Sequence, residues 1–139
     1  MDEQLRESIF NAVAKEPFAQ ALNMRLLDLE PGYSRVAMDY DPGRMNNIYQ
    51  RAHGGAIFGL IDEAFETASQ TGGCIAVALN VNVTYMASPE TGSRLFAEAK
   101  EISQSKKISN FDITVTDDTG QLIAACRAMA YRTGKPVCL

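Results

Sequence analysis

Residues 47–63 read NIYQRAHGGAIFGLIDE, and this stretch decides the fold. Two glycines, Gly54 and Gly55, open an amphipathic run that predicts a helix over residues 54–70. One side of this helix carries an apolar stripe formed by Ile57, Leu60, Ile61, Ala64 and Ala68. Gly72-Gly73 follows as a helix stop. The chain therefore has one long central helix whose apolar face must be covered by another element.

In the sequence, predicted strands come both before and after this helix. A short helix over residues 3–14 and a turn at 18–22 come first, and two strands around Pro31-Gly32 come next. Alternating apolar and polar residues predict four strands after the helix, and Asp117-Asp118-Thr119-Gly120 is typical of a hairpin. The expected strands cover residues 24–31, 33–40, 76–86, 95–99, 107–116 and 122–131. We expect an α+β fold of one domain, residues 1–139, with an antiparallel sheet around the long helix.

Composition limits the classes of partner. Apolar residues make up 46% of the chain and charged residues 22%, as in ordinary globular proteins. The net charge of −4, with only 13 Lys plus Arg, argues against nucleic-acid binding. No apolar run reaches the roughly 18 residues of a membrane span. The acidic N-terminal segment is unlike a secretory signal, so we expect a cytoplasmic protein that contacts no membrane.

The cysteines and the single histidine do not predict a metal site. Cys74, Cys126 and Cys138 are scattered and have no CxxC spacing, and His53 is the only histidine. We expect reduced thiols and no metal bound by these residue types.

The start of the central helix carries the chemistry. Backbone N–H groups at a helix start lack partners and bear partial positive charge, which suits a developing oxyanion. Glycine at position 54 lets a substrate carbonyl approach the backbone closely. Asp62 follows on the same helix as a carboxylate able to activate water. This pattern indicates an acyl-transfer site.

The spacing of these two groups predicts a dimer. Asp62 lies eight residues beyond Gly54, which separates them by about 12 Å at roughly 1.5 Å per residue. Both cannot contact one carbonyl and its attacking water. If they cooperate, a second chain must bring its Asp62 to Gly54, and a twofold axis would create two equivalent sites.

The chain resembles the hotdog-fold acyl-CoA thioesterases, in the branch typified by the phenylacetate-degradation (PaaI-like) thioesterase. The resemblance covers roughly residues 16–133. It rests on Asn47, then His53-Gly54-Gly55, then Asp62, nine positions after the histidine. Supporting segments are Asn82-Val83-Thr84-Tyr85-Met86 with Pro89 and Gly92, and Asp118-Thr119-Gly120-Gln121-Leu122-Ile123-Ala124.

The resemblance implies a role for each residue of this pattern. Asp62 is similar to the catalytic carboxylate, acting as general base or as nucleophile. Gly54 is similar to the residue whose N–H polarises the thioester carbonyl, and Asn47 to the side chain that assists it. His53 is similar to the neighbour that shapes the loop. In such enzymes the acid and the Gly/Asn pair come from opposite subunits, so a homodimer is expected, arranged as a dimer of dimers.

Coenzyme A is expected only as part of the substrate, with no separate cofactor. The residues that the resemblance associates with substrate and coenzyme A are Gly55, Asn80, Tyr85, Ser105, Lys106 and Lys107. The chain has Ala78 where similar enzymes often have Ser or Thr, and Ser105 where many have Gly.

Several assignments have structural alternatives. Glu63 is a rival acid, rotated by roughly 100° from Asp62 on the helix. His53 fits a backbone-capping role as well as a chemical one, and Gly54-Gly55 also fits close helix packing. Lys106-Lys107 is equally consistent with a solvated pair.

The leading function is hydrolysis of an acyl-CoA thioester, with an aryl or medium-length acyl group, to a free acid and coenzyme A. The alternatives are a non-catalytic acyl-CoA-binding module and, ranked last, a hotdog dehydratase. Phe58, Phe65 and Tyr85 are candidates for an aromatic-acyl pocket, or for the core.

Overall fold

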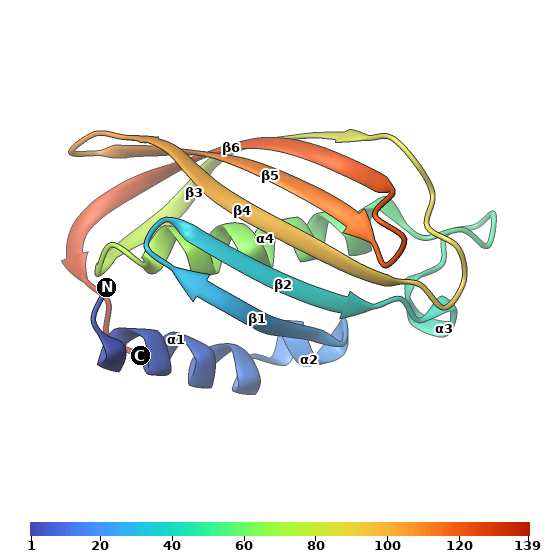
Figure 1. Ribbon diagram of the computed structural model, residues 1–139, viewed down its shortest axis with the longest axis horizontal. Coiled ribbons are helices and arrows are strands. Elements are labelled where there is room, and N and C mark those ends of the chain that lie inside the picture. Colours follow the sequence, from blue (N-terminus) through green and yellow to red (C-terminus); the bar gives the residue numbers. More distant parts are fainter.

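A six-stranded antiparallel sheet wraps around one long helix in the computed structural model, which describes residues 1–139 (Figure 1). The strands follow the order β1-β2-β4-β5-β6-β3 across the sheet. The strand bounds are β1 Met24–Glu30, β2 Tyr33–Asp39, β3 Cys74–Tyr85, β4 Arg94–Gln104, β5 Ile108–Asp117 and β6 Leu122–Pro136. The helix bounds are α1 Glu3–Lys15, α2 Pro17–Ala21, α3 Pro42–Met45 and α4 Gly54–Gln70.

The apolar stripe of α4 holds this helix against the sheet. Leu60, Ile61 and Ala64 are fully buried. Burial of each large aliphatic side chain contributes roughly 1.5–3 kcal/mol. Phe65 meets Phe111 of β5 edge to face, with ring centroids 5.3 Å apart. The predicted core face of the central helix is therefore the observed one.

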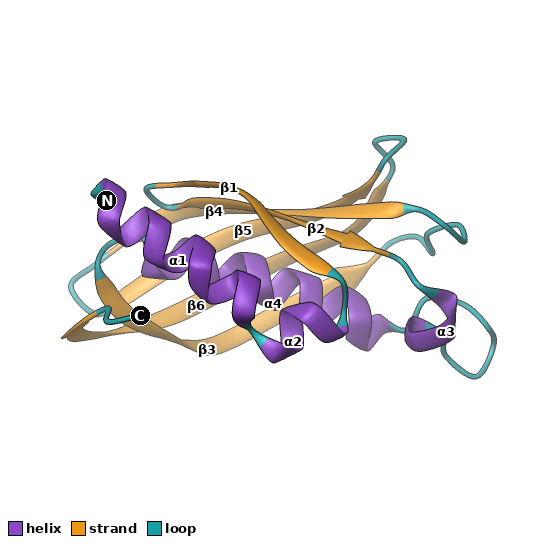
Figure 2. Ribbon diagram, turned by 90° about the horizontal axis from the view of Figure 1, so that it is seen from below, coloured by secondary structure: helices purple, strands orange, loops and turns teal.

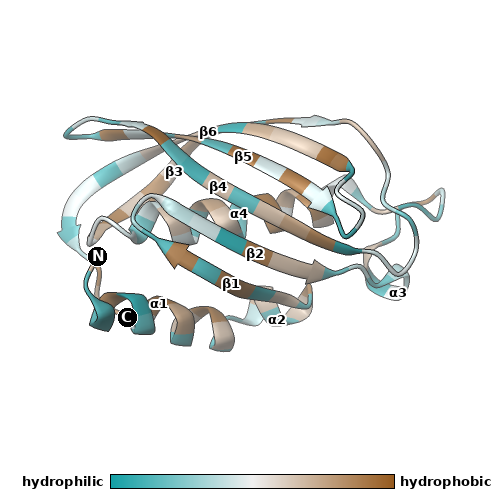
Figure 3. Ribbon diagram, in the orientation of Figure 1, coloured by the Kyte–Doolittle hydropathy of each residue, from teal (hydrophilic) through white to brown (hydrophobic).

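The strands supply the other half of the core by simple alternation. Along β4 and β5, buried and exposed side chains alternate, and the same alternation is visible as colour bands in Figure 3. Small residues, Ala97 and Ala99, are fully buried on β4. On neighbouring β2, the buried hydroxyl of Ser34 donates to the carbonyl oxygen of Ala64 at 2.6 Å, which ties that strand to the middle of α4.

Helices α1 and α2 lie at the β1 edge of the sheet and alongside α4 (Figure 2). Gly59 of α4 permits close approach of α2. A Cβ atom at this position would lie 2.9 Å from Leu22 Cδ1 and 3.1 Å from Phe18 Cζ. The N-terminal segment thus covers a flank of α4 that the sheet leaves open.

Strand β3 forms one edge of the sheet. It pairs only with β6, so its other edge has no partner within the chain. Ile75, Val77 and Leu79 on this strand are exposed. An apolar edge strand of this length is suited to pairing with a second chain.

The predicted α+β fold with a sheet around the central helix is confirmed. Two details differ. A short helix, α3, lies between the expected strand ending at residue 40 and the expected helix starting at residue 54, because Pro42 starts the turn and Asp41 Oδ1 accepts from the N–H of Gly43. Strands β4 and β6 extend beyond their predicted ends at residues 99 and 131, since cross-strand pairing continues through polar sequence. None of the helices is both long and apolar enough to cross a membrane.

Candidate active site

The start of α4 presents one free backbone donor. His53 is the N-cap residue, and its Nδ1 accepts from the N–H of Gly55 at 2.9 Å. The N–H groups of Ala56 and Ile57 donate to the carbonyl oxygen of His53. The N–H of Gly54 has no hydrogen-bond partner within the chain. A single donor at the positive end of the helix is therefore available to an external acceptor.

This arrangement gives His53 a structural function. Because Nδ1 accepts a hydrogen bond, it carries no proton in this state of the ring. The N–H of His53 also donates to Met45 O at 2.6 Å, which fixes the loop that enters the helix. Of the two interpretations left open by the sequence, the structure displays the capping role. It also occupies the N–H of Gly55, which leaves that predicted binding residue no free backbone donor.

Tyr85 closes over the helix start from the end of β3. Its hydroxyl donates to Gly54 O at 3.1 Å. A Cβ atom on Gly54 would lie 3.3 Å from Tyr85 Cζ, so glycine gives the ring room at this position. A cavity of about 360 Å³ opens beside these two residues, and its lining residues include Asn47, Arg51, Ile57 and Ser88. We call it the donor cavity.

Asn47 has a free side-chain donor at the donor cavity. Its Oδ1 accepts from the N–H groups of Tyr49 at 2.8 Å and Arg51 at 3.1 Å. Its Nδ2 has no hydrogen-bond partner within the chain. The asparagine that the family resemblance indicated therefore lines the same cavity as the free Gly54 N–H.

Arg51 is a lining residue that the sequence reasoning missed. Its side chain forms no ion pair within the chain. It offers the donor cavity a positive charge, which suits a phosphate group. The available signal was its position two residues before His53, in the loop that enters the helix.

Asp62 lies at a different cavity. Its half-buried carboxylate forms no hydrogen bond or ion pair within the chain, and burial raises its pKa above the usual value. A carboxylate with a raised pKa binds a proton more tightly and is a stronger general base. The cavity, of about 220 Å³, is lined by Asp62, Phe65, Glu66, Ser69, Ala76, Val77 and Ala78. We call it the acid cavity.

The two cavities share no lining residue. Gly54 and Asp62 belong to one continuous helix, so their eight-residue separation spans about 12 Å. One chain does not bring the acid and the free donor to a common point. The rival acid Glu63 lines neither cavity.

The remaining predicted binding residues are dispersed within one chain. Ser105, Lys106 and Lys107 form the turn between β4 and β5, at the opposite end of the molecule from the start of α4 (Figure 1). Lys107 Nζ donates to Tyr131 Oη at 2.9 Å, and this bond raises the pKa of Lys107. Asn80 is exposed on the edge strand β3. None of these four residues lines the donor or the acid cavity.

The chain matches known proteins across this region. A family model described as the thioesterase superfamily matches residues 49–124, which include Gly54 and Asp62. A protein of Archaeoglobus fulgidus to which esterase activity is attributed is 35% identical over 118 residues, covering 84% of this chain and 75% of that protein.

Two further relatives connect sequence and structure. The acyl-coenzyme A thioesterase PaaI of Escherichia coli is 29% identical over 84% of this chain and 82% of its own. The structure of PaaI, from the phenylacetic acid degradation operon, superposes with a TM-score of 0.91 at 25% identity over 97% of both chains. A Streptococcus mutans protein bound to acetyl CoA gives a TM-score of 0.78 at 28% identity over 83% of this chain and 92% of that one.

Proposed function

The chain belongs to the thioesterase superfamily, and from this premise we propose that it hydrolyses acyl-CoA thioesters at a site shared by two subunits. One observation carries the proposal. The helix α4 has a free N–H at its first residue and an unpaired carboxylate eight residues later, in separate cavities. Each cavity holds half of the chemistry that thioester hydrolysis requires.

The proposed reaction uses both halves. The thioester oxygen accepts hydrogen bonds from the Gly54 N–H and Asn47 Nδ2 of one chain. The partner subunit's Asp62 removes a proton from water as the water attacks the carbonyl carbon. The tetrahedral intermediate then breaks its C–S bond, and the coenzyme A thiolate leaves and takes up the proton. If Asp62 instead attacks directly, an acyl-enzyme forms, which mass spectrometry after acid quench would detect.

The free edge of β3 supports the dimer. Antiparallel pairing of two β3 strands would continue the sheet and cover the exposed Ile75, Val77 and Leu79. It would also relate two α4 helices by a twofold axis, as the separated cavities require. We propose this dimer as the catalytic unit, and a dimer of dimers as the complete assembly.

We propose aryl or medium-length acyl groups as substrates. The support is the relationship to a thioesterase from a phenylacetic acid degradation operon. Among the predicted aromatic residues, Phe65 packs against Phe111 and borders the acid cavity, whereas Phe58 is exposed on α4. Release of free thiol from phenylacetyl-, octanoyl- and palmitoyl-CoA tests this choice, and a tenfold preference for palmitoyl-CoA would contradict it.

Replacement of the acid tests the mechanism. Asp62→Asn keeps the side-chain volume and removes the base, so kcat should fall by about 10²–10⁴-fold while the fold persists. Asp118→Asn, in the exposed β5–β6 hairpin, is the matched control and should retain activity. Turnover measured by thiol release, alongside circular dichroism, checks both results.

Two outcomes would contradict this proposal. Near-normal turnover of Asp62→Asn with loss of turnover in Glu63→Gln would show that Glu63, and not Asp62, is the catalytic acid. Saturable acyl-CoA binding by the wild type with no turnover on any substrate would favour a binding module.

A further inference from the structure

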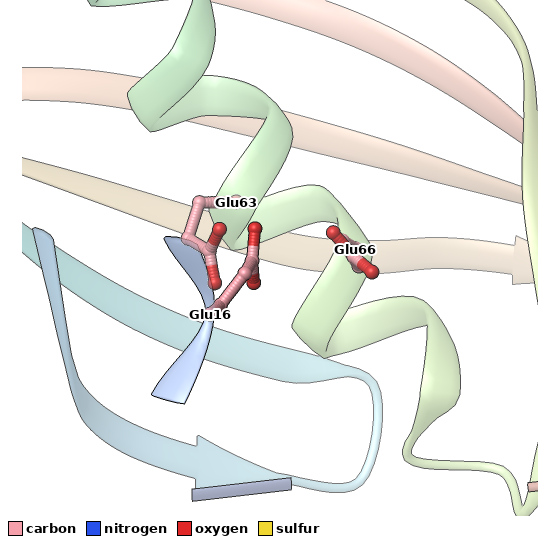
Figure 4. Close-up of side chains that lie close together, drawn as sticks. All are labelled: Glu16, Glu63 and Glu66. Atoms are coloured by element: carbon pink, nitrogen blue, oxygen red, sulfur yellow. The ribbon is translucent and has the colours of Figure 1, made fainter. Parts of the chain in front are cut away.

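Three glutamates meet where the N-terminal helices join α4. Glu16 lies between α1 and α2, where it ends one helix and begins the other. Glu63 and Glu66 lie one turn apart on α4. One carboxylate oxygen from each residue lies within 4.8 Å of the others, and their carboxylates gather on one side of α4 in Figure 4.

Glu63 is the least expected member of this cluster. Only 2% of its surface is exposed, and its Oε1 has no hydrogen-bond partner. Its carboxylate is turned toward that of Glu16 (Figure 4). The Glu16 and Glu63 carboxyls are close enough to share a hydrogen bond when one of them is protonated. Without that proton or a cation, a carboxylate buried in this position is strongly destabilising.

The chain itself supplies no compensating charge. No Lys, Arg or His nitrogen lies within 4.0 Å of any of the three carboxylates. Lys15 borders the same cavity without forming an ion pair. Burial, and then the neighbouring carboxylates of Glu16, Glu66 and Asp62, raise the pKa of Glu63 to about 8. Below about pH 8 the Glu63 carboxyl therefore retains a proton, and a cation bound here would displace it.

The cluster also has space around it. It borders a cavity of about 650 Å³ between α1, α4, the start of β3 and the C-terminal residues. Three carboxylates leave several coordination positions of a cation open, and water fills these positions in protein sites for hard cations. The cavity provides room for such water molecules.

We propose that Glu16, Glu63 and Glu66 bind one divalent cation, and that Ca²⁺ fits the site best. Oxygen ligands select hard cations. At Ca–O distances of roughly 2.3–2.6 Å, ligands on opposite sides of the ion are about 5 Å apart. For Mg²⁺, at roughly 2.1 Å, they are at most about 4.2 Å apart. The three oxygens lie within 4.8 Å of one another, and the longer Ca–O distances span such a separation with less movement of the ligands than Mg–O distances would.

The ion would connect two parts of the molecule. Glu16 belongs to the junction of α1 and α2, and Glu63 directly follows Asp62 on α4. Binding would fix the N-terminal helices against the helix that carries the acid. The expectation of no metal was drawn from His and Cys alone and did not consider carboxylates, of which Glu16 is far in the sequence from Glu63 and Glu66.

Calcium binding by purified protein, stripped with EDTA and dialysed, tests the proposal. We expect Ca²⁺ alone to raise the melting temperature and to give a saturable isotherm in titration calorimetry. Glu63→Gln and Glu16→Gln should weaken binding at least about tenfold, because each removes a ligand charge. Glu90→Gln, an exposed acid in the loop before β4, is the matched control and should bind as the wild type does.

The readouts separate this proposal from catalysis. Asp62→Asn should keep the calcium-dependent shift even though its turnover is lost. Glu63→Gln should fold, because it removes a buried charge and keeps the volume. Equal calcium-dependent shifts of the melting temperature in wild type and Glu63→Gln would mean that the ion binds elsewhere, and would overturn the proposed site. The absence of a shift with Ca²⁺, Mg²⁺ and Mn²⁺ would also overturn it, and would leave a shared proton as the compensation.

Discussion

At the scale of single residues, His53 determines which backbone donor is free at the start of α4. Its Nδ1 occupies the N–H of Gly55, its carbonyl oxygen occupies those of Ala56 and Ile57, and only Gly54 is left. The hydroxyl of Tyr85 donates to the carbonyl oxygen of Gly54, in the next peptide along the chain. The His53–Gly54 peptide, which carries the proposed oxyanion donor, is held through its own carbonyl oxygen before any substrate arrives, which is a requirement for effective electrostatic stabilisation.

Two substitutions of His53 separate capping from chemistry. Asparagine is among the best N-cap residues, so His53→Asn should keep both stability and most of the turnover. His53→Ala removes the cap and should lower the free energy of unfolding by about 1 kcal/mol. Urea unfolding and kcat of the two variants give the comparison. Equal loss of turnover in both, with stability retained in His53→Asn, would assign the imidazole a direct chemical role.

At the scale of elements, the β5–β6 hairpin depends on one carboxylate. Asp117 ends β5, and its Oδ1 accepts from Thr119 Oγ1 at 2.7 Å and from the N–H groups of Thr119 and Gln121, each at 2.9 Å. The bond from the Thr119 hydroxyl, followed by the backbone N–H groups, lowers the pKa of Asp117. The ionised form therefore stabilises the turn that connects β5 to β6.

The stabilisation should depend on pH in a defined direction. The pKa of Asp117 is lower in the folded state than in the unfolded state. Its contribution to stability is therefore complete above the unfolded pKa, about 3.9, and is lost as the pH falls through the folded pKa. Asp117→Ala should melt at a lower temperature than the wild type at neutral pH, and this difference should shrink below about pH 4. Thermal melts across pH, with Asp118→Ala as control, measure it. If the difference in melting temperature between wild type and Asp117→Ala grows on acidification, the ionised form of Asp117 is not the one that stabilises the turn.

The elements also mark how far the sequence could predict the molecule. The helix over residues 54–70 was predictable because its apolar stripe and its terminal glycines are local signals. Asn47 and Asp62 were assigned through the resemblance that rests on their spacing to His53, and the structure places Asn47 at the donor cavity and Asp62 at the acid cavity.

Burial of Glu63 was not predictable in the same way. Its helical position borders the apolar stripe, but the junction at Glu16 covers it from a distant part of the chain. Similarly, only the three-dimensional arrangement reveals that Ser105 and both lysines lie far from Gly54 within one chain. When one side of a helix is buried by residues from a distant part of the chain, the local sequence of the helix gives no sign of it.

At the scale of the whole molecule, the proposed mechanism assigns its donor and its acid to two separate cavities of the chain. The donor cavity contains Gly54 and Asn47, and the acid cavity contains Asp62. A twofold dimer would pair each donor cavity with the acid cavity of the other chain. A chain that lacks the acid and a chain that lacks the donor should then form a mixed dimer with one complete site.

Co-refolding of two inactive variants tests this complementation. Gly54→Pro removes the N–H, and proline is compatible with the first position of a helix and with the extended conformation of His53 before it. Mixed with Asp62→Asn, it should restore up to about a quarter of wild-type activity, because half of the dimers are mixed and each has one intact site.

Gly54→Ala is the matched control for that variant. It introduces the same Cβ atom near Tyr85 but keeps the N–H, so it should remain far more active than Gly54→Pro. Heterodimers verified by native mass spectrometry without any recovery of activity would mean that acid and donor act within one chain.

The order of strands has a consequence for synthesis of the protein. Strand β3 is made in the middle of the chain, yet its only partner within the sheet is β6, at residues 122–136. While the ribosome is still adding β4 and β5, β3 has both edges open and its apolar residues uncovered. Such a strand is prone to pair with the wrong neighbour. The nascent chain can therefore complete its sheet only once its last strand has emerged, and a product that stops before residue 122 would leave β3 without a partner.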